Sequence, residues 1–151
     1  MIYRKAKLED VPAIIALLAN DKLGKKRENF TSPLASSYVN AFQAIEQDPN
    51  QELIVLESNT KEIIGTLQLT FIPYLTYQGG IRAQIEAVRI KDTERGKGLG
   101  KQLFEWAINR AKERKAHVIQ LTSDKQRPQA ISFYKTLGFK DSHEGMKLFL
   151  G

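Results

Sequence analysis

Arg95-Gly96-Lys97-Gly98-Leu99-Gly100 stands between a predicted strand over residues 81–90 and a predicted helix that follows it directly. Glycines at alternate positions allow a tight turn and leave the backbone N–H groups of the loop uncovered. The helix adds unpaired first-turn N–H donors and the positive end of its dipole. The stretch therefore predicts a phosphate-binding loop.

Two common nucleotide-binding motifs do not match this loop. In a Walker A motif, Gly-Lys is followed by Ser or Thr, whereas Gly100-Lys101 is followed by Gln102 and no glycine stands at position 95. The dinucleotide fingerprint G-x-G-x-x-G needs a third glycine where Lys101 stands, and it follows the first strand of its fold rather than a late one. Both motifs are excluded.

Composition and length indicate an ordinary globular protein. The chain has 151 residues, of which 42% are hydrophobic and 26% charged, so we expect a single domain over residues 1–151. The absence of cysteine excludes disulfides, thiolate ligands and a cysteine nucleophile. His117 and His143, the only histidines, lack the spacing of metal ligands, so no metal is expected.

The start of the chain predicts neither export nor a membrane partner. Residues 1–5 lack the apolar segment of a signal peptide, and the longest apolar run, residues 13–19, is too short to span a bilayer. We therefore expect a cytoplasmic protein.

Positive charge is concentrated around the glycine loop. The net charge is +6, and residues 89–115 contribute nine Lys/Arg against four Asp/Glu. A local anionic ligand explains this excess. A nucleic-acid surface is the alternative, but the chain has no arginine-rich run or basic patch interleaved with aromatic residues, so no nucleic acid is expected as a partner.

Hydrophobic periodicity predicts an α/β fold with a mixed sheet. The predicted strands cover residues 2–6, 53–56, 63–72, 81–90 and 118–121, and Met146, Leu148 and Leu150 alternate as in a closing strand. The predicted helices cover residues 9–19, a stretch from residue 34 with Ser32-Pro33 as its cap, the segment after the glycine loop, and residues from Pro128 to Gly138.

A family resemblance rests on three stretches. Arg95, Gly98 and Gly100 match the pattern Gln/Arg-x-x-Gly-x-Gly/Ala. Residues 85–90 precede this loop as Ile-Glu-Ala-Val-Arg-Ile, and residues 130–139 follow it as Ala-Ile-Ser-Phe-Tyr-Lys-Thr-Leu-Gly-Phe. Over nearly its whole length the chain resembles the GCN5-related N-acetyltransferases (GNAT). The resemblance implies a mixed, mostly antiparallel sheet with helices on both faces and a splayed pair of parallel strands.

In that family, acetyl-CoA lies where the two parallel strands separate, here residues 84–90 and 118–121. The resemblance implies that the backbones of Val88 and Ile90 contact the pantetheine arm. It assigns the pyrophosphate to the backbone amides of the glycine loop, and to its glycines more firmly than to the Arg95 side chain. These amides belong to Arg95, Gly96, Lys97, Gly98, Leu99, Gly100 and Lys101.

Acetyl transfer needs a neutral amine, yet an alkyl amine has a pKa near ~10.4. The resemblance implies that Glu86 accepts the proton through water, that Tyr134 donates one to the departing thiolate, and that the Val88 N–H stabilises the oxyanion. The alternatives are a salt-bridged strand carboxylate for Glu86 and a core tyrosine for Tyr134.

Candidate residues for the acceptor are Arg27, Glu28, Arg82, Gln84 and His143. Arg27 and Glu28 are equally compatible with solvated loop charges, and His143 with a surface position. Adjacent residues of an extended segment point to opposite sides, so Ser142-His143-Glu144 is not expected to form a catalytic triad.

The leading functional hypothesis is direct transfer of acetyl from acetyl-CoA to a primary amine of a small molecule or peptide, in a ternary complex. The alternative is a non-catalytic acyl-CoA sensor or partner-binding domain, and a basic nucleic-acid binder is the third hypothesis. A homodimer is compatible with any of them.

Overall fold

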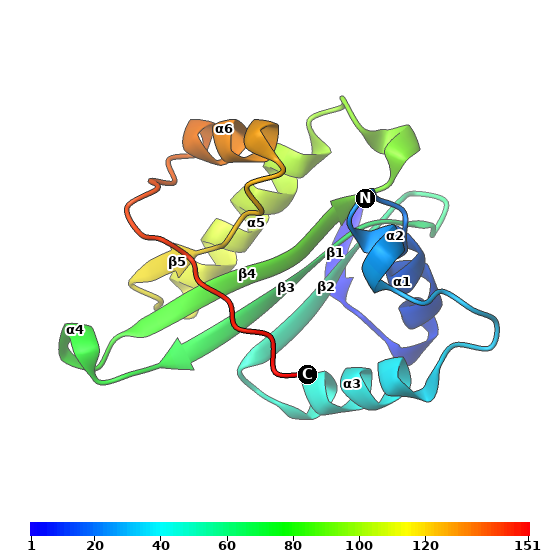
Figure 1. Cartoon of the computed structure of the whole chain (residues 1–151), viewed down its shortest axis with the longest axis horizontal. Helices are drawn as coiled ribbons and strands as arrows, with labels where there is room; N and C mark the ends of the chain where they lie inside the picture. Colours follow the sequence, from blue (N-terminus) through cyan, green and yellow to red (C-terminus); the bar gives the residue numbers. More distant parts are fainter.

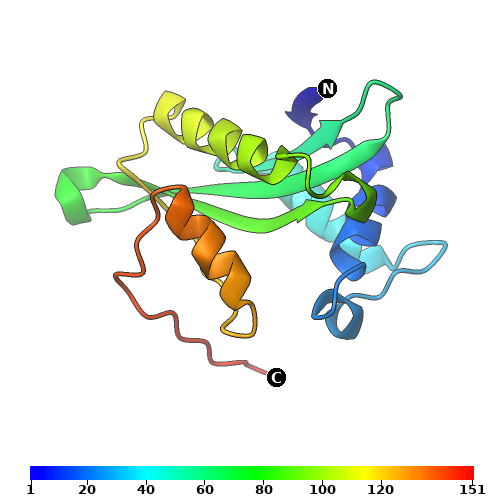
Figure 2. The same cartoon turned by 90° about the horizontal axis from the view of Figure 1, so that it is seen from above.

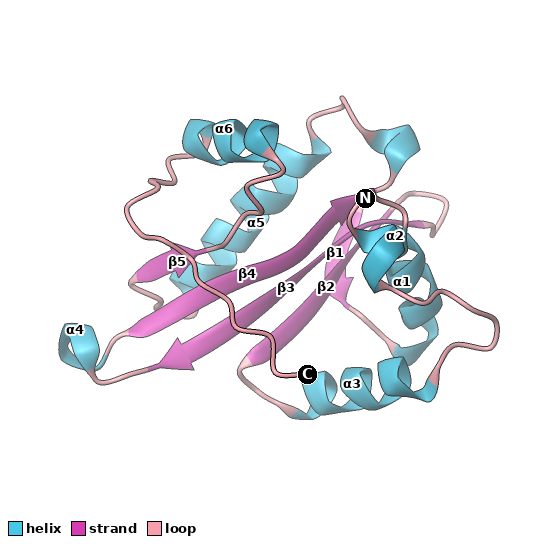
Figure 3. Cartoon of the chain, in the orientation of Figure 1, coloured by secondary structure: helices cyan, strands magenta, loops and turns pink.

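The computed structural model describes residues 1–151, the whole chain. Five strands form one sheet in the order β1-β2-β3-β4-β5. Neighbouring strands are antiparallel except β4 and β5, which are parallel, as Figures 1 and 3 show. The predicted α/β class and mixed sheet are confirmed. The strands are β1 (Ile2–Lys5), β2 (Gln51–Glu57), β3 (Ile63–Pro73), β4 (Ile81–Ile90) and β5 (Val118–Gln120).

Helices lie on both sides of this sheet. Figure 2 shows α5 on one side and α6 on the other. None of the helices combines the length and the apolar composition needed to cross a lipid bilayer. The helices are α1 (Val11–Ala19), α2 (Gly24–Arg27), α3 (Ser36–Gln47), α4 (Thr76–Gly79), α5 (Leu99–Glu113) and α6 (Pro128–Thr136), with 3₁₀ turns η1 (Leu8–Asp10) and η2 (Asp92–Glu94).

The main core lies between α5 and the sheet. Leu103, Phe104, Ala107 and Ala111 are spaced by three or four residues, so they form one face of α5, and all four are buried. This face packs against alternate residues of the three central strands. These strand residues are Ile54, Leu67, Leu69, Phe71, Ala83 and Ile85.

The opposite face of the sheet is only partly apolar. Val11, Ile15 and Phe42 of α1 and α3 pack near Leu53 of β2. Farther along this face the side chains are polar and bond to one another. Gln51 accepts hydrogen bonds from Gln68 (2.8 Å) and Thr70 (2.8 Å), and Gln84 accepts one from Gln120 (2.6 Å). A polar surface therefore borders β4.

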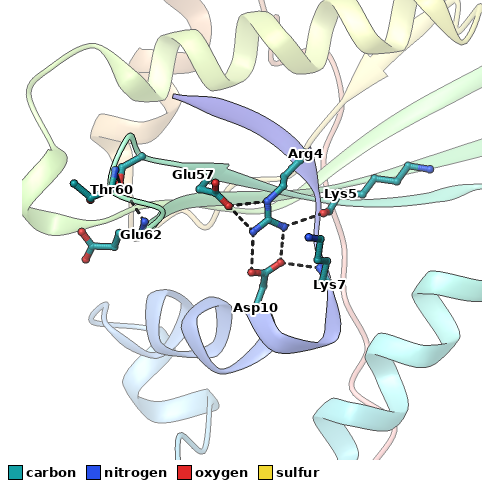
Figure 4. A network of polar contacts seen from close by, with 8 residues as sticks. Arg4, Lys5, Lys7, Asp10, Glu57, Thr60 and Glu62 are labelled. Atoms are coloured by element: carbon teal, nitrogen blue, oxygen red, sulfur yellow. Dashed lines mark hydrogen bonds and ion pairs between the residues drawn. The ribbon is translucent and has the colours of Figure 1, made fainter.

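Arg4 joins the first elements of the chain. Its guanidinium forms ion pairs with Asp10 of η1 (2.7 Å) and Glu57 of β2 (2.8 Å), shown in Figure 4. Asp10 is buried and also accepts a hydrogen bond from the Lys7 backbone N–H (2.7 Å). The network fixes the start of α1 against β1 and β2.

A bulge in β4 sets which residues face the core. The pairing of β3 with β4 shifts register between Thr66 and Gln68, and Ala87 has a φ of 55°. Ala83 and Ile85 before the bulge face the core, and so do Val88 and Ile90 after it. Without the extra residue the core-facing positions would reverse beyond this point.

Two sequence predictions about elements are wrong. Met146, Leu148 and Leu150 form no strand, because the chain after α6 runs free of the sheet as a loop (Figure 3). The second long helix begins at Ser36 rather than at residue 34, with Ala35 as its N-cap, so Ser32-Pro33 does not cap it.

Candidate functional site

Strands β4 and β5 separate after a short parallel ladder. The paired residues are Arg82 with Val118, Ala83 with Ile119 and Gln84 with Gln120. From there β4 continues to Ile90 without a neighbour on that side, while the chain leaves β5 toward α6. The separation predicted for these strands is present. The unpaired side of β4 includes Val88 and Ile90, and the Val88 carbonyl there accepts a hydrogen bond from Arg89 (2.7 Å).

The glycine loop lies where β4 ends and α5 begins. Gly96 and Gly98 both have a φ of 79°, a conformation that residues with a Cβ rarely adopt. Gly98 is also the N-cap of α5. The backbone N–H groups of residues 96–101 make no hydrogen bond within the chain, since the first bond of the helix runs from the Gln102 N–H to the Gly98 carbonyl. The loop is a continuous row of free donors.

Charged side chains of the loop pair with their neighbours. Arg95 lies 2.9 Å from Asp92, and Lys97 lies 2.8 Å from Glu94. Both cations are more than half exposed, so their pairing is weak. The structure gives the backbone of the loop, more than its side chains, a geometry suited to an anion.

A polar cleft of about 480 Å³ borders the loop on the side of α2. It is lined by Asn20, Asp21, Lys22, Lys25, Lys26, Asp92 and Arg95. Four of these side chains are cationic and two are carboxylates, so the lining has a net positive charge, which favours a negatively charged ligand. An apolar cleft of about 450 Å³ lies elsewhere, beside α1 and residues 30–34, and contains no predicted site residue.

Glu86 lies on the polar face of β4, opposite Gln68 of β3. Its side chain is exposed and makes no ion pair or hydrogen bond. The salt-bridged alternative for this residue therefore has no partner in the structure. A carboxylate held on a strand beside the separated strands, and free of other contacts, can accept a proton from a bound molecule or from water.

Tyr134 lies on α6, half-buried, with its ring 5.4 Å from that of Phe104 and 6.2 Å from that of Phe139. Burial raises the pKa of its hydroxyl, an effect that nearby Arg127 and Arg89 partly offset. The hydroxyl makes no hydrogen bond within the chain and carries its proton at neutral pH. It can act as a proton donor.

An ion triad beside Tyr134 was not predicted from the sequence. Asp21 lies 2.8 Å from Arg89 of β4 and 2.9 Å from Arg127 at the start of α6. Burial disfavours the charged form of Asp21, but the Gly24 N–H and the two guanidinium groups outweigh it and lower the pKa of Asp21 to about 2. No local sequence pattern predicts such a triad, because its three residues are far apart in the sequence.

Two arginines of β4 retain unused donors. The Nε atoms of Arg82 and Arg89 are buried and have no hydrogen-bond partner. Arg82 has no carboxylate partner and lies over the ring of Tyr74, 5.1 Å from its centroid. Along β4, Arg82 comes before Glu86 and Arg89 comes after it. Because Ala83, Ile85, Val88 and Ile90 face the core, all three charged residues lie on the opposite, polar face of the sheet. Buried unpaired donors are unusual in folded proteins. Arg89 is otherwise paired with Asp21, so Arg82 is the cation of this face without a partner.

The remaining predicted acceptor residues are not all gathered here. Gln84 lies on the same face as Glu86, two residues away. Arg27 pairs with Glu28 at 2.6 Å, and Glu28 also accepts a hydrogen bond from the Tyr38 hydroxyl (3.1 Å). Both belong to the segment near Asp21 rather than to the sheet.

His143 lies in the exposed segment after α6. Its Nδ1 and the Ser142 hydroxyl are 2.7 Å apart, so these adjacent side chains do meet, contrary to the sequence expectation. Glu144 makes no hydrogen bond to the ring, and no triad forms.

Residues 21–139 match the acetyltransferase (GNAT) family. The chain belongs to this family. The GNAT match covers the glycine loop, both separated strands and Tyr134, so the resemblance predicted from the sequence is confirmed.

Curated relatives of this GNAT chain include acetyltransferases of small amines. An L-methionine sulfoximine/L-methionine sulfone acetyltransferase of Pseudomonas paraeruginosa is 26% identical over 92% of this chain and 80% of the relative. An aminoalkylphosphonate N-acetyltransferase of Salmonella typhimurium is 27% identical over 93% of this chain and 85% of the relative.

Solved structures show the same GNAT architecture. A protein of Bacillus halodurans described as a transcriptional regulator is 55% identical, with a TM-score of 0.95 over 99% of both chains. A predicted acetyltransferase of Clostridium acetobutylicum, crystallised with acetyl-CoA, is 25% identical, with a TM-score of 0.74 over 98% of this chain and 95% of that chain.

Proposed function

We propose that residues 1–151 form one N-acetyltransferase domain that transfers the acetyl group of acetyl-CoA to a primary amine of a small molecule or peptide. The observation that carries this proposal is the row of free N–H groups at residues 96–101, next to the unpaired side of β4. The pyrophosphate would accept hydrogen bonds from that row, and the pantetheine arm would extend along Val88 and Ile90. The family assignment and the acetyl-CoA of the Clostridium neighbour support the cosubstrate.

Chemistry in a ternary complex needs proton transfers away from the amine and to the departing thiolate. The amine nitrogen attacks the acetyl carbonyl carbon once its proton has passed, through water, to Glu86. The Val88 N–H, at the bulge of β4, would stabilise the oxyanion that develops. The carbon–sulfur bond then breaks, and Tyr134 donates a proton to the sulfur. The nitrogen gives up its remaining extra proton as the amide forms, which restores the Tyr134 hydroxyl through water, so no covalent enzyme intermediate is required.

The acceptor we favour carries an anionic group besides its amine. Arg82 has no ion-pair or hydrogen-bond partner and lies on the same face of the sheet as Glu86, whereas Arg89 is already paired with Asp21. A guanidinium can bind a carboxylate or phosphonate through paired hydrogen bonds. L-Methionine derivatives and aminoalkylphosphonates, which are named for the curated relatives, both carry such a group beside an amine.

An acceptor panel assayed by thiol release with DTNB tests the proposal. Each anionic amine is paired with a neutral analogue, for example an amino acid with its amide and 2-aminoethylphosphonate with ethanolamine. We expect turnover, with a higher kcat/KM for the anionic member of each pair. Equal kcat/KM values within every pair would contradict only the preference for an anionic acceptor. The absence of thiol release with any amine would contradict acetyl transfer itself.

A non-catalytic acyl-CoA-binding domain is the second candidate. The description of the 55% identical Bacillus neighbour as a transcriptional regulator favours it. Free Glu86 and Tyr134 side chains beside the cosubstrate site argue for catalysis instead. Calorimetry that detects CoA binding, together with no turnover on the whole panel, would support the sensor. DNA or RNA binding that weakens steeply with salt in gel shifts would support a nucleic-acid binder.

A further inference from the structure

Arg82 is a cation on the polar face of β4 that no carboxylate of the chain neutralises. It makes no ion pair or hydrogen bond, and its Nε is buried. Its guanidinium carbon lies 5.1 Å from the centroid of the Tyr74 ring. A buried donor without a partner costs free energy, so this side chain favours a hydrogen-bond acceptor supplied by a ligand.

The contact with Tyr74 places this guanidinium toward the β3–β4 hairpin, away from Glu86. The Tyr74 ring stacks on that of His117, with 5.5 Å between the ring centroids. The His117 ring stands against Gly80, where an added Cβ would lie 2.6 Å from the His117 Cδ2. Gly80 precedes Arg82 in the chain, on the side opposite to Glu86. An anion bound by Arg82 therefore lies at the hairpin end of β4.

The acetyl transfer proposed above takes place near the other end of β4. The β3 partners of Arg82 and Arg89 are Ile72 and Thr66, which are about 20 Å apart at the usual ~3.3 Å per residue of a strand. Val88, whose N–H we assign to the oxyanion, directly precedes Arg89. An attacking amine lies about 3 Å from the acetyl carbon, and that N–H lies about 3 Å from the oxygen on the same carbon. The amine and an anion at Arg82 are thus separated by about 10 Å.

The surface between these two points carries amide side chains. Gln84 of β4 accepts a hydrogen bond from Gln120 of β5 (2.6 Å). That bond uses the Gln84 oxygen and the Gln120 nitrogen, so the Gln84 amide N–H groups and the Gln120 amide oxygen remain available. A peptide unit carries one hydrogen-bond acceptor and one donor, which complement these groups. A chain of methylene groups would leave both unused.

We infer that the acceptor is the N-terminal amine of a peptide with an acidic side chain at its third or fourth residue. An extended residue spans at most ~3.3–3.6 Å, so about three residues reach from the amine to a carboxylate at Arg82. Paired hydrogen bonds between that carboxylate and the guanidinium fix the orientation of the peptide. In an α-amino acid or 2-aminoethylphosphonate the charged groups are only a few bonds apart, so these acceptors gain only the solvent-screened attraction of the distant cation. The inference rests on the proposed acetyl transfer and specifies its substrate class.

Alanine pentapeptides with a free N-terminus and an amidated C-terminus test the spacing by thiol release with DTNB. The second, third or fourth residue is replaced by Asp, and each peptide is compared with its Asn counterpart. We expect kcat/KM to be about tenfold or more higher for Asp than for Asn at the third or fourth residue, because a charged hydrogen bond is gained there. At the second residue, where the carboxylate does not reach Arg82, the two values should be similar.

Two variants connect this profile to Arg82. Arg82→Gln should bring the Asp/Asn ratio of kcat/KM close to one at every position. Lys112→Gln, which removes the same charge from an exposed position of α5 on the other face of the sheet, should keep the wild-type profile. Circular dichroism checks that both variants are folded.

The outcomes separate the peptide acceptor from acetyl transfer itself. Equal ratios at all positions in the wild type, or a positional preference that persists in Arg82→Gln, would overturn the inference and leave acetyl transfer intact. Thiol release with amines of the earlier panel but with no peptide would do the same. The absence of thiol release with every amine and every peptide would overturn both.

Discussion

Glu86 is the residue on which the proposed deprotonation of the amine depends. We expect Glu86→Gln to lower kcat by roughly 10²-fold or more at neutral pH, because general-base catalysis contributes about that much. The deficit should shrink as the pH approaches ~10, where the amine loses its proton unaided. Glu46→Gln, at an exposed position of α3, is the control. A constant deficit at all pH values would show that Glu86 acts structurally.

Tyr134 is the proposed donor to the thiolate. Tyr134→Phe keeps the aromatic packing but removes the proton, so we expect kcat to fall by roughly 10²-fold with little change in CoA affinity. Burial raises the pKa of Tyr134 above its ordinary value, so the wild type should show no loss of this acid up to pH ~10. Tyr77→Phe, at an exposed ring, should be neutral. Full activity of Tyr134→Phe in initial-rate assays would remove the assigned role.

Asp21 links stability to pH through its two arginines. Its pKa falls to about 2 in the folded chain. The unfolded value is ~3.9, so the triad contributes about 2 kcal/mol that is present above pH ~4 and lost as the pH falls toward 2. Urea unfolding should show Asp21→Asn less stable than wild type at pH 7, with the gap closing below pH 4. Glu46→Gln should show no such gap. A gap for Asp21→Asn that does not change with pH would contradict the ion triad.

At the scale of elements, the glycine loop combines a backbone requirement with the pyrophosphate binding that we propose for it. Gly98 and Gly79 have φ values of 79° and 75°, and a Cβ at either would meet nothing within 4 Å. Each alanine substitution therefore carries a similar backbone strain of ~1–2 kcal/mol. We expect only Gly98→Ala to weaken CoA binding in calorimetry, by about tenfold or more, because only that turn belongs to the row of free N–H groups that we propose binds the pyrophosphate. Equal CoA affinities of the two variants would argue against the loop as the pyrophosphate site.

Elements with strong local signals were predictable. Strand β4 spans residues 81–90 as predicted, since its apolar positions and the glycine loop mark both ends. The predicted start of the helix from Ser36 is wrong. Ser32-Pro33 has the residue types of a helix cap, but the helix begins only after Ala35. Glu86, Tyr134 and the loop carry a family motif. The Asp21–Arg89–Arg127 triad depends on contacts between distant segments, which composition and periodicity do not encode.

At the scale of the whole molecule, the arrangement follows from which edges and faces are covered. Helix α5 covers one face of the sheet, while the other face remains polar beside the separated strands β4 and β5. The closing strand was predicted from the alternation of Met146, Leu148 and Leu150, and the structure leaves it unpaired. Hydrophobic periodicity indicates that a segment can form a strand. It does not predict which edge of the sheet, if any, that strand pairs with.

The most direct test of acetyl transfer follows the label of [¹⁴C-acetyl]-CoA into an amine. The full chain is incubated with labelled acetyl-CoA and each acceptor of the panel, and the products are separated by chromatography. We expect label in an N-acetylated amine, formed in proportion to the CoA released and lost in the Glu86→Gln, Tyr134→Phe double variant. Release of label only as free acetate, or CoA binding without transfer to any amine, would contradict it.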